Sequence, residues 1–367
     1  MKENDIVFTI IGAGNTGQAL AGYLKMKGLT VRLYDRSAWR FRYLRHHDMN
    51  LGDEFSSVRA LHMDMLTTDL KEAVSGADVI IVSITSTAHA EIAQKLAQFL
   101  SDGQVVLLHP GRTGGALIFK KVVEGVNPNL KIVIGEFETS LFATRVTQEG
   151  AKVRYYGIKK NVHLATIPSE NSLEIAPFVK SVFPQVEFAP DVLYTSLSNY
   201  GAMLHPAPVI FNVGRIENKT RFTHYIEGIT PSIARFIERI DSERIALGKC
   251  LDVRLKPITV WLSDVYDSKG NNLFELLRNT KAYHFILGPD SLQHRYLIED
   301  TLTGLVPMVH LARKCGVRLR AIETLVNLIN YFVDIDVMAY GRNLEDMGIR
   351  RMEISDIIHY VVNGVGT

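Results

Sequence analysis

One histidine, His205, lies between small and apolar residues and two prolines in the segment NYGAMLHPAP, residues 199–208. An imidazole has an ordinary pKa of about 6.5, so it can give and take a proton near neutral pH, as general acid–base catalysis requires. The alternative is a histidine with satisfied hydrogen bonds beside a proline kink, which is common in protein interiors. The segment alone makes His205 a candidate proton carrier and leaves both interpretations open.

A second chemical signal is the segment IIGAGNTGQAL, which spaces Gly12, Gly14 and Gly17 as G-x-G-x-x-G. The glycines follow an apolar, strand-like run and precede a helix-like segment. There the first glycine permits a tight turn, the second lets main-chain N–H groups such as those of Asn15 and Thr16 approach a pyrophosphate, and the third allows close packing. We therefore predict a dinucleotide-binding turn; an ordinary turn without a ligand is the alternative.

The residues that follow the next strand-like run bear on the choice of cofactor. Asp35 ends the segment VRLYD, 18 residues after Gly17, where a carboxylate can accept hydrogen bonds from the adenosine ribose and favour NAD. Arg36 is its neighbour and is suited to bind the 2′-phosphate of NADP instead. The sequence predicts NAD or NADP, with NAD slightly favoured, and a solvated acid at a strand end is the alternative for Asp35.

These residues need elements to position them, and the first half of the chain supplies a βαβ pattern. Between residues 7 and 83, short β-branched runs alternate with helix-length segments, which is typical of a parallel sheet buried on both faces. Further strand candidates are residues 104–108, 131–135, 152–157 and 162–167. We expect the sheet to extend to about residue 190.

After residue 191 the pattern becomes helical. Ile233, Phe236, Ile237 and Ile240 have the spacing of an amphipathic helix, and Thr230 followed by proline is a typical helix start. A second apolar face is expected over residues 320–337. The predicted fold class is α/β: an N-terminal Rossmann-type dinucleotide-binding domain, residues 1–190, and a C-terminal all-α domain, residues 191–367. A cleft between two such domains is the expected place for a site.

Composition excludes several classes of protein. The 367 residues suit two domains, and a net charge of +2 from 41 basic and 39 acidic side chains gives no broad field for nucleic acid or an anionic membrane. The N-terminal segment lacks a signal-peptide core and no run reaches membrane-span length, so we expect a cytoplasmic protein. Cys250 and Cys315 are too few for a disulfide framework or a zinc site, and we expect both to be buried.

Several spaced segments together resemble one known family. In order along nearly the whole chain they are the glycine segment, HPGRTGGALIF at 109–119, NYGAMLHPAPVIFNVGRIE, FTHYIEGITPSIARFIERIDSERIALGKCL and HRYLIEDTLTGLVP. In these segments the chain resembles the opine dehydrogenases, the octopine and nopaline dehydrogenase family. The resemblance implies a Rossmann domain followed by a helical domain. It also implies reductive condensation of an amino acid's amine with an α-keto acid, such as pyruvate, using NAD(P)H.

The resemblance also implies roles for particular residues. His205, in the segment that begins at Asn199, is similar to the catalytic histidine, and Asp300 in RYLIED to the acid that supports it. Arg295 is similar to the arginine beside that pair, where it would bind a substrate carboxylate or orient Asp300. A surface pair is the alternative for Arg295 and Asp300. Asn199 is expected to contribute to substrate binding.

Two further segments are candidates for the substrate pocket. Glu138 in GEFETSLFATR resembles the family's glutamate segment and is expected to bind substrate, but Ala143 and Thr144 stand where relatives carry a cysteine, so the amino-acid pocket is expected to differ. The residues His109, Arg112 and Thr113 follow another strand and are expected either to approach the nicotinamide or substrate or to form a plain surface turn.

Two other functions stay open. One is a related two-domain dehydrogenase of a hydroxy acid or a phosphorylated alcohol, and the other is a nucleotide-binding protein without catalysis. Four scattered histidines lack metal-ligand spacing and are predicted to be packing or surface residues, so no metal is expected: His224, His284, His294 and His310. The apolar segment ISDIIHYVVNGVGT is expected to cover the core, with a homodimer contact as the alternative.

Overall fold

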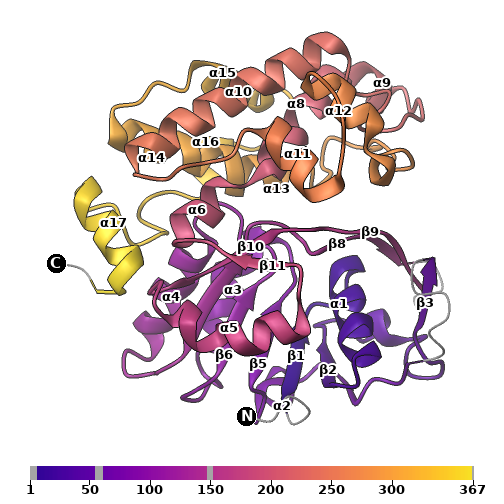
Figure 1. Ribbon diagram of the computed structural model, residues 1–367, viewed down its shortest axis with the longest axis vertical. Coiled ribbons are helices and arrows are strands. Elements are labelled where there is room, and N and C mark those ends of the chain that lie inside the picture. Colours follow the sequence, from indigo (N-terminus) through magenta and orange to yellow (C-terminus); the bar gives the residue numbers. More distant parts are fainter. Residues whose placement is uncertain (1–5, 54–60, 147–151, 366–367) are drawn as a thin grey trace. The chain divides into compact units, whose positions relative to one another are not determined.

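The computed structural model describes residues 6–53, 61–146 and 152–365 (Figure 1). The chain divides into two compact units. The first comprises residues 1–111 and 115–192, and the second comprises residues 112–114 and 193–367. The three residues 112–114 therefore belong with the C-terminal half, although they lie between elements of the N-terminal half in sequence.

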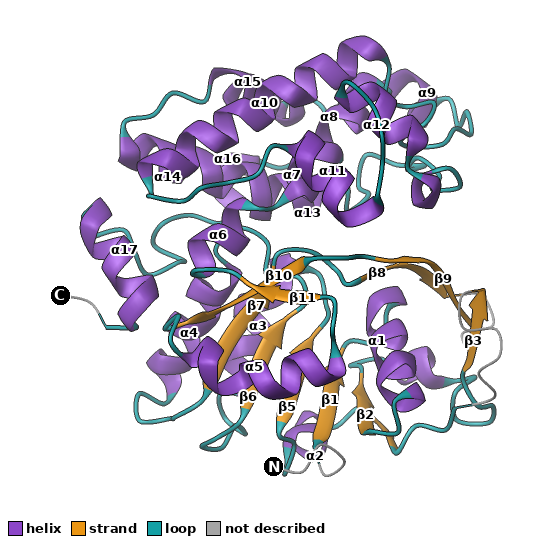
Figure 2. Ribbon diagram, in the orientation of Figure 1, coloured by secondary structure: helices purple, strands orange, loops and turns teal. Residues whose placement is uncertain are grey.

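The first unit contains an eight-stranded sheet in the order β11-β10-β7-β6-β5-β1-β2-β4 (Figure 2). Its strands are β1 (Val7–Ile11), β2 (Thr30–Tyr34), β4 (Met65–Thr67), β5 (Val79–Val82), β6 (Val105–Leu108), β7 (Val133–Phe137), β10 (Val162–Ile167) and β11 (Val186–Phe188). Every residue of β5, β6 and β7 is buried, as expected for central strands covered on both faces. The covering helices are α1 (Asn15–Met26), α2 (Leu70–Val74), α3 (His89–Leu96), α4 (Gly115–Val126) and α5 (Asn171–Val182).

The sheet differs from the predicted parallel sheet in two strands, β10 and β11, which are parallel to each other and run opposite to the other six. β10 pairs antiparallel with β7, with Leu164 opposite Phe137 and Ile167 opposite Ile134. The physical reason is that no helix lies between the two strands in sequence to carry the chain back to the other edge, so β10 starts at the end where β7 stops. The N-terminal half is thus a Rossmann-like domain with a mixed sheet.

The predicted strand at 152–157 is present but does not join the large sheet. It forms β9 (Lys152–Ile158), which pairs with β3 (Asn50–Asp53) and β8 (Phe142–Val146) in a separate three-stranded sheet. This small sheet packs on α1, where the Tyr155 hydroxyl donates a 2.5 Å hydrogen bond to the Ala19 carbonyl. Tyr155 therefore anchors the second sheet to the helix of the glycine turn.

The second unit is helical. Its helices are α6 (Val192–Leu197), α7 (Tyr200–Leu204), α8 (Pro206–Phe211), α9 (Val213–Glu217), α10 (Pro231–Cys250), α11 (Ile258–Tyr266), α12 (Leu273–Asn279), α13 (Ile298–Asp300), α14 (Val306–Cys315), α15 (Arg320–Asn330), α16 (Val337–Tyr340) and α17 (Ile354–Asn363). Two short helical segments, η4 (Lys281–Tyr283) and the π-helical η5 (Thr301–Leu305), complete it. The predicted start of α10 is confirmed, because Thr230 Oγ1 accepts a hydrogen bond from the Ile233 N–H.

Two expectations in this half are corrected, for the end of α15 and for the cysteines, and the expected burial of the C-terminal apolar segment is confirmed. The second predicted helix, α15, ends at Asn330 and not near residue 337, because Asn330 Oδ1 caps the Val337 N–H and starts a new turn, which leaves Phe332 partly exposed. Cys250 and Cys315 are half-buried, and the Cys250 thiol lies 3.7 Å from the Cys315 carbonyl oxygen. The apolar face of α17 is covered within the single chain at Ile357, Tyr360 and Val361.

Candidate active site

His205 lies at a break between two short helices. α7 ends at Leu204 and α8 begins at Pro206, which has no N–H and therefore cannot continue the hydrogen bonds of α7. At the other end of α7, the Asn199 side chain caps the helix by accepting a hydrogen bond from the Ala202 N–H at 3.3 Å. His205 therefore lies outside the regular hydrogen bonding of both helices, and 12% of its side chain is exposed.

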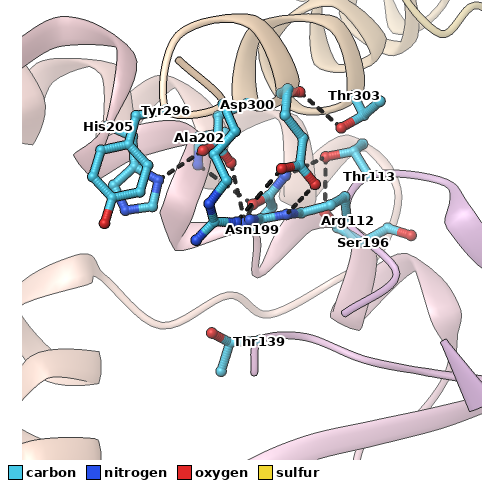
Figure 3. A network of polar contacts seen from close by, with 12 residues as sticks. Arg112, Thr113, Thr139, Ser196, Asn199, Ala202, His205, Tyr296, Asp300 and Thr303 are labelled. Atoms are coloured by element: carbon cyan, nitrogen blue, oxygen red, sulfur yellow. Dashed lines mark hydrogen bonds and ion pairs between the residues drawn. The ribbon is translucent and has the colours of Figure 1, made fainter. Parts of the chain in front are cut away.

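Asp300 is the residue that the structure places against this imidazole. Its Oδ2 lies 2.7 Å from His205 Nδ1, and its side chain is fully buried (Figure 3). Asp300 ends α13 at the point where the π-helical segment η5 begins. Such π-helical turns are frequent at functional sites because they re-aim a side chain within a helix. The expected pairing of His205 with Asp300 is therefore present in the fold.

The cation beside Asp300 is Arg112. Its Nη1 lies 3.1 Å from Asp300 Oδ1 and 3.2 Å from Asn199 Oδ1, and its Nε lies 3.9 Å from Glu299 Oε1 (Figure 3). The backbone of Arg112 is left-handed, with φ of 62°, which is uncommon for a residue with a side chain and is typical of functional turns. Gly201 makes room for it, because a Cβ there would lie 2.3 Å from Arg112 Nη1.

The segment that carries Arg112 is fixed by hydrogen bonds to several helices. The Thr113 N–H donates to the Thr303 carbonyl at 3.1 Å, and Thr113 Oγ1 donates to the Ser196 carbonyl at 3.1 Å. The Thr303 carbonyl is available to accept this bond because Pro307, four residues later, lacks the N–H that would donate to it in a regular helix. Arg342 Nη1 also donates to the Thr113 carbonyl at 2.5 Å. The expectation of a plain surface turn is wrong for Arg112 and Thr113, since both are buried.

These contacts set the charges of the pair. Burial alone would raise the pKa of Asp300, but the nearby Arg112 and His205 outweigh it and lower that pKa to about 2. Burial lowers the pKa of His205 below its ordinary value, and Asp300 opposes part of this effect. Near neutral pH the pair is thus a carboxylate and an imidazole that donates its Nδ1 proton to it. Nε2 is left as the nitrogen that can exchange a proton.

Among the described residues Arg295 forms an ion pair with Glu299 and not with Asp300, although it is near enough for its charge to help lower the pKa of Asp300. Of the two roles that the resemblance implied for Arg295, binding of a substrate carboxylate stays a prediction. Arg295 lies four residues before Glu299, and its Nη1 is 3.5 Å from Glu299 Oε2, while 54% of its side chain is exposed. Positions four apart share one face of a helix, whereas Asp300, five positions on, points elsewhere. The guanidinium that holds Asp300 is that of Arg112, which the sequence singled out as a residue near the nicotinamide or substrate, or in a surface turn, but not as a partner of Asp300.

Aromatic rings enclose the imidazole. Tyr296 stacks on His205 with ring centroids 4.0 Å apart and an interplanar angle of 12°. The Tyr225 hydroxyl lies 2.9 Å from His205 Nε2. His224 is buried, and its ring centroid lies 5.8 Å from that of His205. It packs as predicted, and its burial lowers its pKa to about 3. Tyr225 was not identified from the sequence, where only its position beside His224 distinguished it.

The glycine turn of the first unit fits a dinucleotide. Gly12 has a φ of 105°, and a Cβ at Gly17 would lie 1.7 Å from the Gly12 carbonyl oxygen, so both positions require glycine. A Cβ at Gly14 would meet nothing within 4 Å. Gly14 caps α1 without a side-chain hydrogen bond, which leaves the first N–H groups of the helix, at Asn15 and Thr16, without a cap from a side chain. An open backbone at an uncapped helix start is suited to bind a pyrophosphate.

Asp35 lies beside this turn. Its Oδ2 accepts a 2.9 Å hydrogen bond from the Ala13 N–H, and its Oδ1 accepts one of the same length from the Ser37 N–H. Each carboxylate oxygen has a second lone pair that can accept from a ribose hydroxyl. The Arg36 side chain is exposed beside it. Both residues are therefore within the same short turn after β2, as their spacing predicted.

The other candidates of the first unit lie at the carboxyl ends of its strands. Glu138 directly follows β7 and is buried; its Oε1 accepts a hydrogen bond from the His163 N–H at 3.2 Å, and its Oε2 has no hydrogen-bond partner among the described residues. His109 follows β6, and its Nε2 accepts a hydrogen bond from the Leu141 N–H at 2.9 Å. Burial lowers the pKa of His109 to about 3, so it is a neutral packing residue.

Two classes of feature are absent from the residues that the structure describes. No group of three histidine, cysteine, aspartate or glutamate side chains there has the arrangement to hold a metal ion. None of the described helices is long and apolar enough to span a membrane.

The fold and the site define a two-domain, nicotinamide-dependent dehydrogenase. Residues 7–134 match the family described as NAD-dependent glycerol-3-phosphate dehydrogenase N-terminus, and residues 188–333 match NAD/NADP octopine/nopaline dehydrogenase, alpha-helical domain. The chain is 35% identical over 350 residues to an opine dehydrogenase of Arthrobacter sp. (strain 1C), covering 95% of this chain and 97% of that one. The chain belongs to the opine dehydrogenase family.

More distant relatives have the same fold. An octopine dehydrogenase of Pecten maximus is 21% identical over 86% of this chain and 88% of its own length. The structure of an octopine dehydrogenase in complex with NADH and agmatine matches with a TM-score of 0.80 at 19% identity, covering 99% of each chain. A yersinopine dehydrogenase with NADP⁺ bound matches with a TM-score of 0.75 at 14% identity, over 94% of this chain and 98% of that chain. The protein is an NAD(P)-dependent oxidoreductase that acts on CH–NH donors.

Proposed function

We propose that this opine dehydrogenase joins an amino acid's amine to an α-keto acid such as pyruvate, and that His205 carries the proton that the reaction consumes. The observation that supports this most directly is the 2.7 Å hydrogen bond between His205 Nδ1 and the ionised Asp300. That bond fixes the tautomer in which Nε2 is the exchangeable nitrogen, and it stabilises the imidazolium form when Nε2 gains a proton.

The proton balance requires such a group. A protonated amine and a ketone combine with one hydride and one proton to give a protonated secondary amine and one water. Loss of that water from the carbinolamine needs a proton on the departing oxygen, and bound NAD(P)H supplies the hydride that then reaches the imine carbon. His205 would donate the proton in this direction and accept it in the reverse oxidation.

We propose that Arg295 binds a substrate anion, that Glu138 binds the substrate amine, and that Asn199 contributes to the substrate site by positioning Arg112. The half-exposed guanidinium of Arg295 is suited to bind a substrate carboxylate in a bidentate manner, and Asn199 holds the Arg112 side chain beside the pair. Glu138, with one buried oxygen that has no hydrogen-bond partner in the described chain, is suited to accept from the amino acid's amine. Structures of octopine dehydrogenase with L-arginine and with pyruvate support substrates of these two classes.

We further propose that residues 1–190 bind the dinucleotide and residues 191–367 supply the acid–base pair. Asp35 favours NAD over NADP, because its carboxylate would repel a 2′-phosphate. The proposed setting is the cytoplasm, and the proposed partners are small molecules. Val362 and Val365 are exposed near the C-terminus, so a homodimer is the oligomeric state to test first.

The activity test follows absorbance loss from NADH and NADPH with pyruvate, each with and without a mixture of L-amino acids. The proposal predicts oxidation that depends on the amine. Oxidation at the same rate without an amine would contradict it and support a hydroxy-acid or phosphorylated-alcohol dehydrogenase instead. A subsequent screen of single amino acids and keto acids identifies the substrates.

A further inference from the structure

The exchangeable nitrogen of His205 contacts a side chain that bears a hydroxyl group. Tyr225 Oη lies 2.9 Å from His205 Nε2, on the opposite edge of the ring from Asp300. With Nδ1–H donated to Asp300, the neutral imidazole has only a lone pair at Nε2, so the Tyr225 hydroxyl is the donor in this bond. When Nε2 is protonated the roles reverse, because the phenol oxygen can also accept.

The tyrosine is held firmly in this position. It is 4% exposed, and its ring stacks on Tyr283 with centroids 3.9 Å apart and an angle of 13°. The edge of His224 packs against it at 4.7 Å and 88°. Tyr296 fixes the other partner by stacking on the His205 ring. Buried, stacked rings of this kind lose contacts when they move, so the hydroxyl is pre-positioned on Nε2.

We propose that Tyr225 is a relay residue that passes the proton between His205 and the substrate, so that Asp300, His205 and Tyr225 act in series. This inference rests on the proposed role of His205. In the condensing direction His205 first takes up the one proton that the reaction consumes, so that Nε2 is protonated and the Tyr225 oxygen accepts from it. The phenol proton then moves to the carbinolamine oxygen, the C–O bond breaks and water leaves. In the same step the Nε2 proton moves to the phenol oxygen, which restores the hydroxyl. No oxidant or further reactant is needed, and the reverse reaction runs the two transfers backwards.

The surroundings of Tyr225 agree with a relay that stays neutral. Burial raises the pKa of Tyr225 well above its ordinary value, and the neighbouring Tyr296 raises it further. The hydroxyl therefore does not remain as a phenolate between turnovers, and it always has one proton to give while it receives another. A phenolate would instead keep His205 protonated and stop the exchange.

The test compares Tyr225→Phe with the matched control Tyr283→Phe by single-turnover NADH oxidation. Both changes keep a stacked aromatic ring, but only Tyr225→Phe removes the oxygen on Nε2. We expect Tyr225→Phe to slow the single turnover about 10²-fold or more, in the range of a lost proton donor, with NADH affinity and melting temperature unchanged. Tyr283→Phe should stay within about 3-fold of the wild type by the same reasoning.

Two results would overturn the relay: Tyr225→Phe within about 3-fold of the wild type, or an equal loss in both variants, which would indicate packing alone. A His205→Ala variant with wild-type turnover would instead refute the proposed function itself, which keeps the two failures distinct. If Tyr225→Phe does not fold, the wild-type single-turnover rate in mixtures of H₂O and D₂O tests whether two protons move in the same step. A curved dependence on deuterium fraction, from two protons in motion, supports the relay, and a linear one contradicts it.

Discussion

Acidification from pH 7 to pH 5 should destabilise this protein through two buried histidines, one in each unit. His109 and His224 are 1% and 0% exposed, and burial lowers the pKa of each to about 3. In the unfolded chain both titrate near 6.5. Between about pH 6.5 and pH 3 the unfolded state therefore binds more protons than the folded state, so stability falls as the pH falls through this window.

The size of the effect follows from the two pKa values. At pH 5, a histidine that titrates near 6.5 in the unfolded chain and stays neutral in the folded protein lowers the free energy of unfolding by RT ln(1 + 10^1.5), which is about 2 kcal/mol. The two histidines together should remove about 4 kcal/mol, a large part of the stability of an ordinary domain. Asp300, whose pKa is lowered to about 2, loses its stabilising contribution only as the pH falls below its unfolded pKa of about 4, so it changes little between pH 7 and pH 5.

The assay is urea unfolding at pH 7 and pH 5 for the wild type, His109→Gln and His224→Gln, with the exposed His46→Gln as the control. In the wild type the free energy of unfolding should be lower at pH 5 than at pH 7, and each of the two substitutions at a buried histidine should reduce this difference by about 2 kcal/mol, whatever the stability of the variant at pH 7. The control should keep the full difference. Equal pH dependence in all four proteins would refute the burial argument.

Three other predictions concern the site and the cofactor. Asp300→Asn should lower kcat by roughly 10²- to 10⁴-fold. Because Asp300 raises the pKa of His205, the change should also move the acid limb of the pH–rate profile for oxidation of the opine, in which His205 accepts the proton, to lower pH. An acid limb that does not move would contradict the pairing of the two residues. Gly14→Ala should weaken NADH binding and leave the melting temperature unchanged, whereas Gly17→Ala should lower both the NADH affinity and the melting temperature, because only at Gly17 would the Cβ strike the backbone. Calorimetric titration measures the affinity and thermal unfolding the melting temperature. Equal behaviour of the two variants would be inconsistent with the turn described. Arg36→Ala should leave the Kd of both NADH and NADPH unchanged, and a selective loss of NADPH binding would show instead that this arginine recognises the 2′-phosphate.

Much of the dinucleotide turn could be predicted from sequence because its determinants are local. The spacing of Gly12, Gly14 and Gly17 and the position of Asp35 depend on one strand, one turn and one helix start. The start of α10 was equally local, since Thr230 and a proline suffice to specify it. The family resemblance added the pairing of His205 with Asp300, which lies 95 residues away in the chain.

The rest of the site depends on tertiary structure that no local pattern encodes. Arg112 reaches Asp300 only because a left-handed turn places residues 112–114 among the helices and because Gly201 leaves space there. The antiparallel β10 likewise follows from a missing crossover helix and not from the composition of the strand. Tyr225 offered no spacing signal, since its contact with His205 depends on the stacked rings around it.

The most direct test of the central claim is the single-turnover rate of His205→Ala, measured together with its NADH affinity. If His205 carries the proton, the rate of NADH oxidation with amine and keto acid should fall by roughly 10² to 10⁴ while the Kd of NADH stays nearly constant. A variant that oxidises NADH at the wild-type rate would contradict the account.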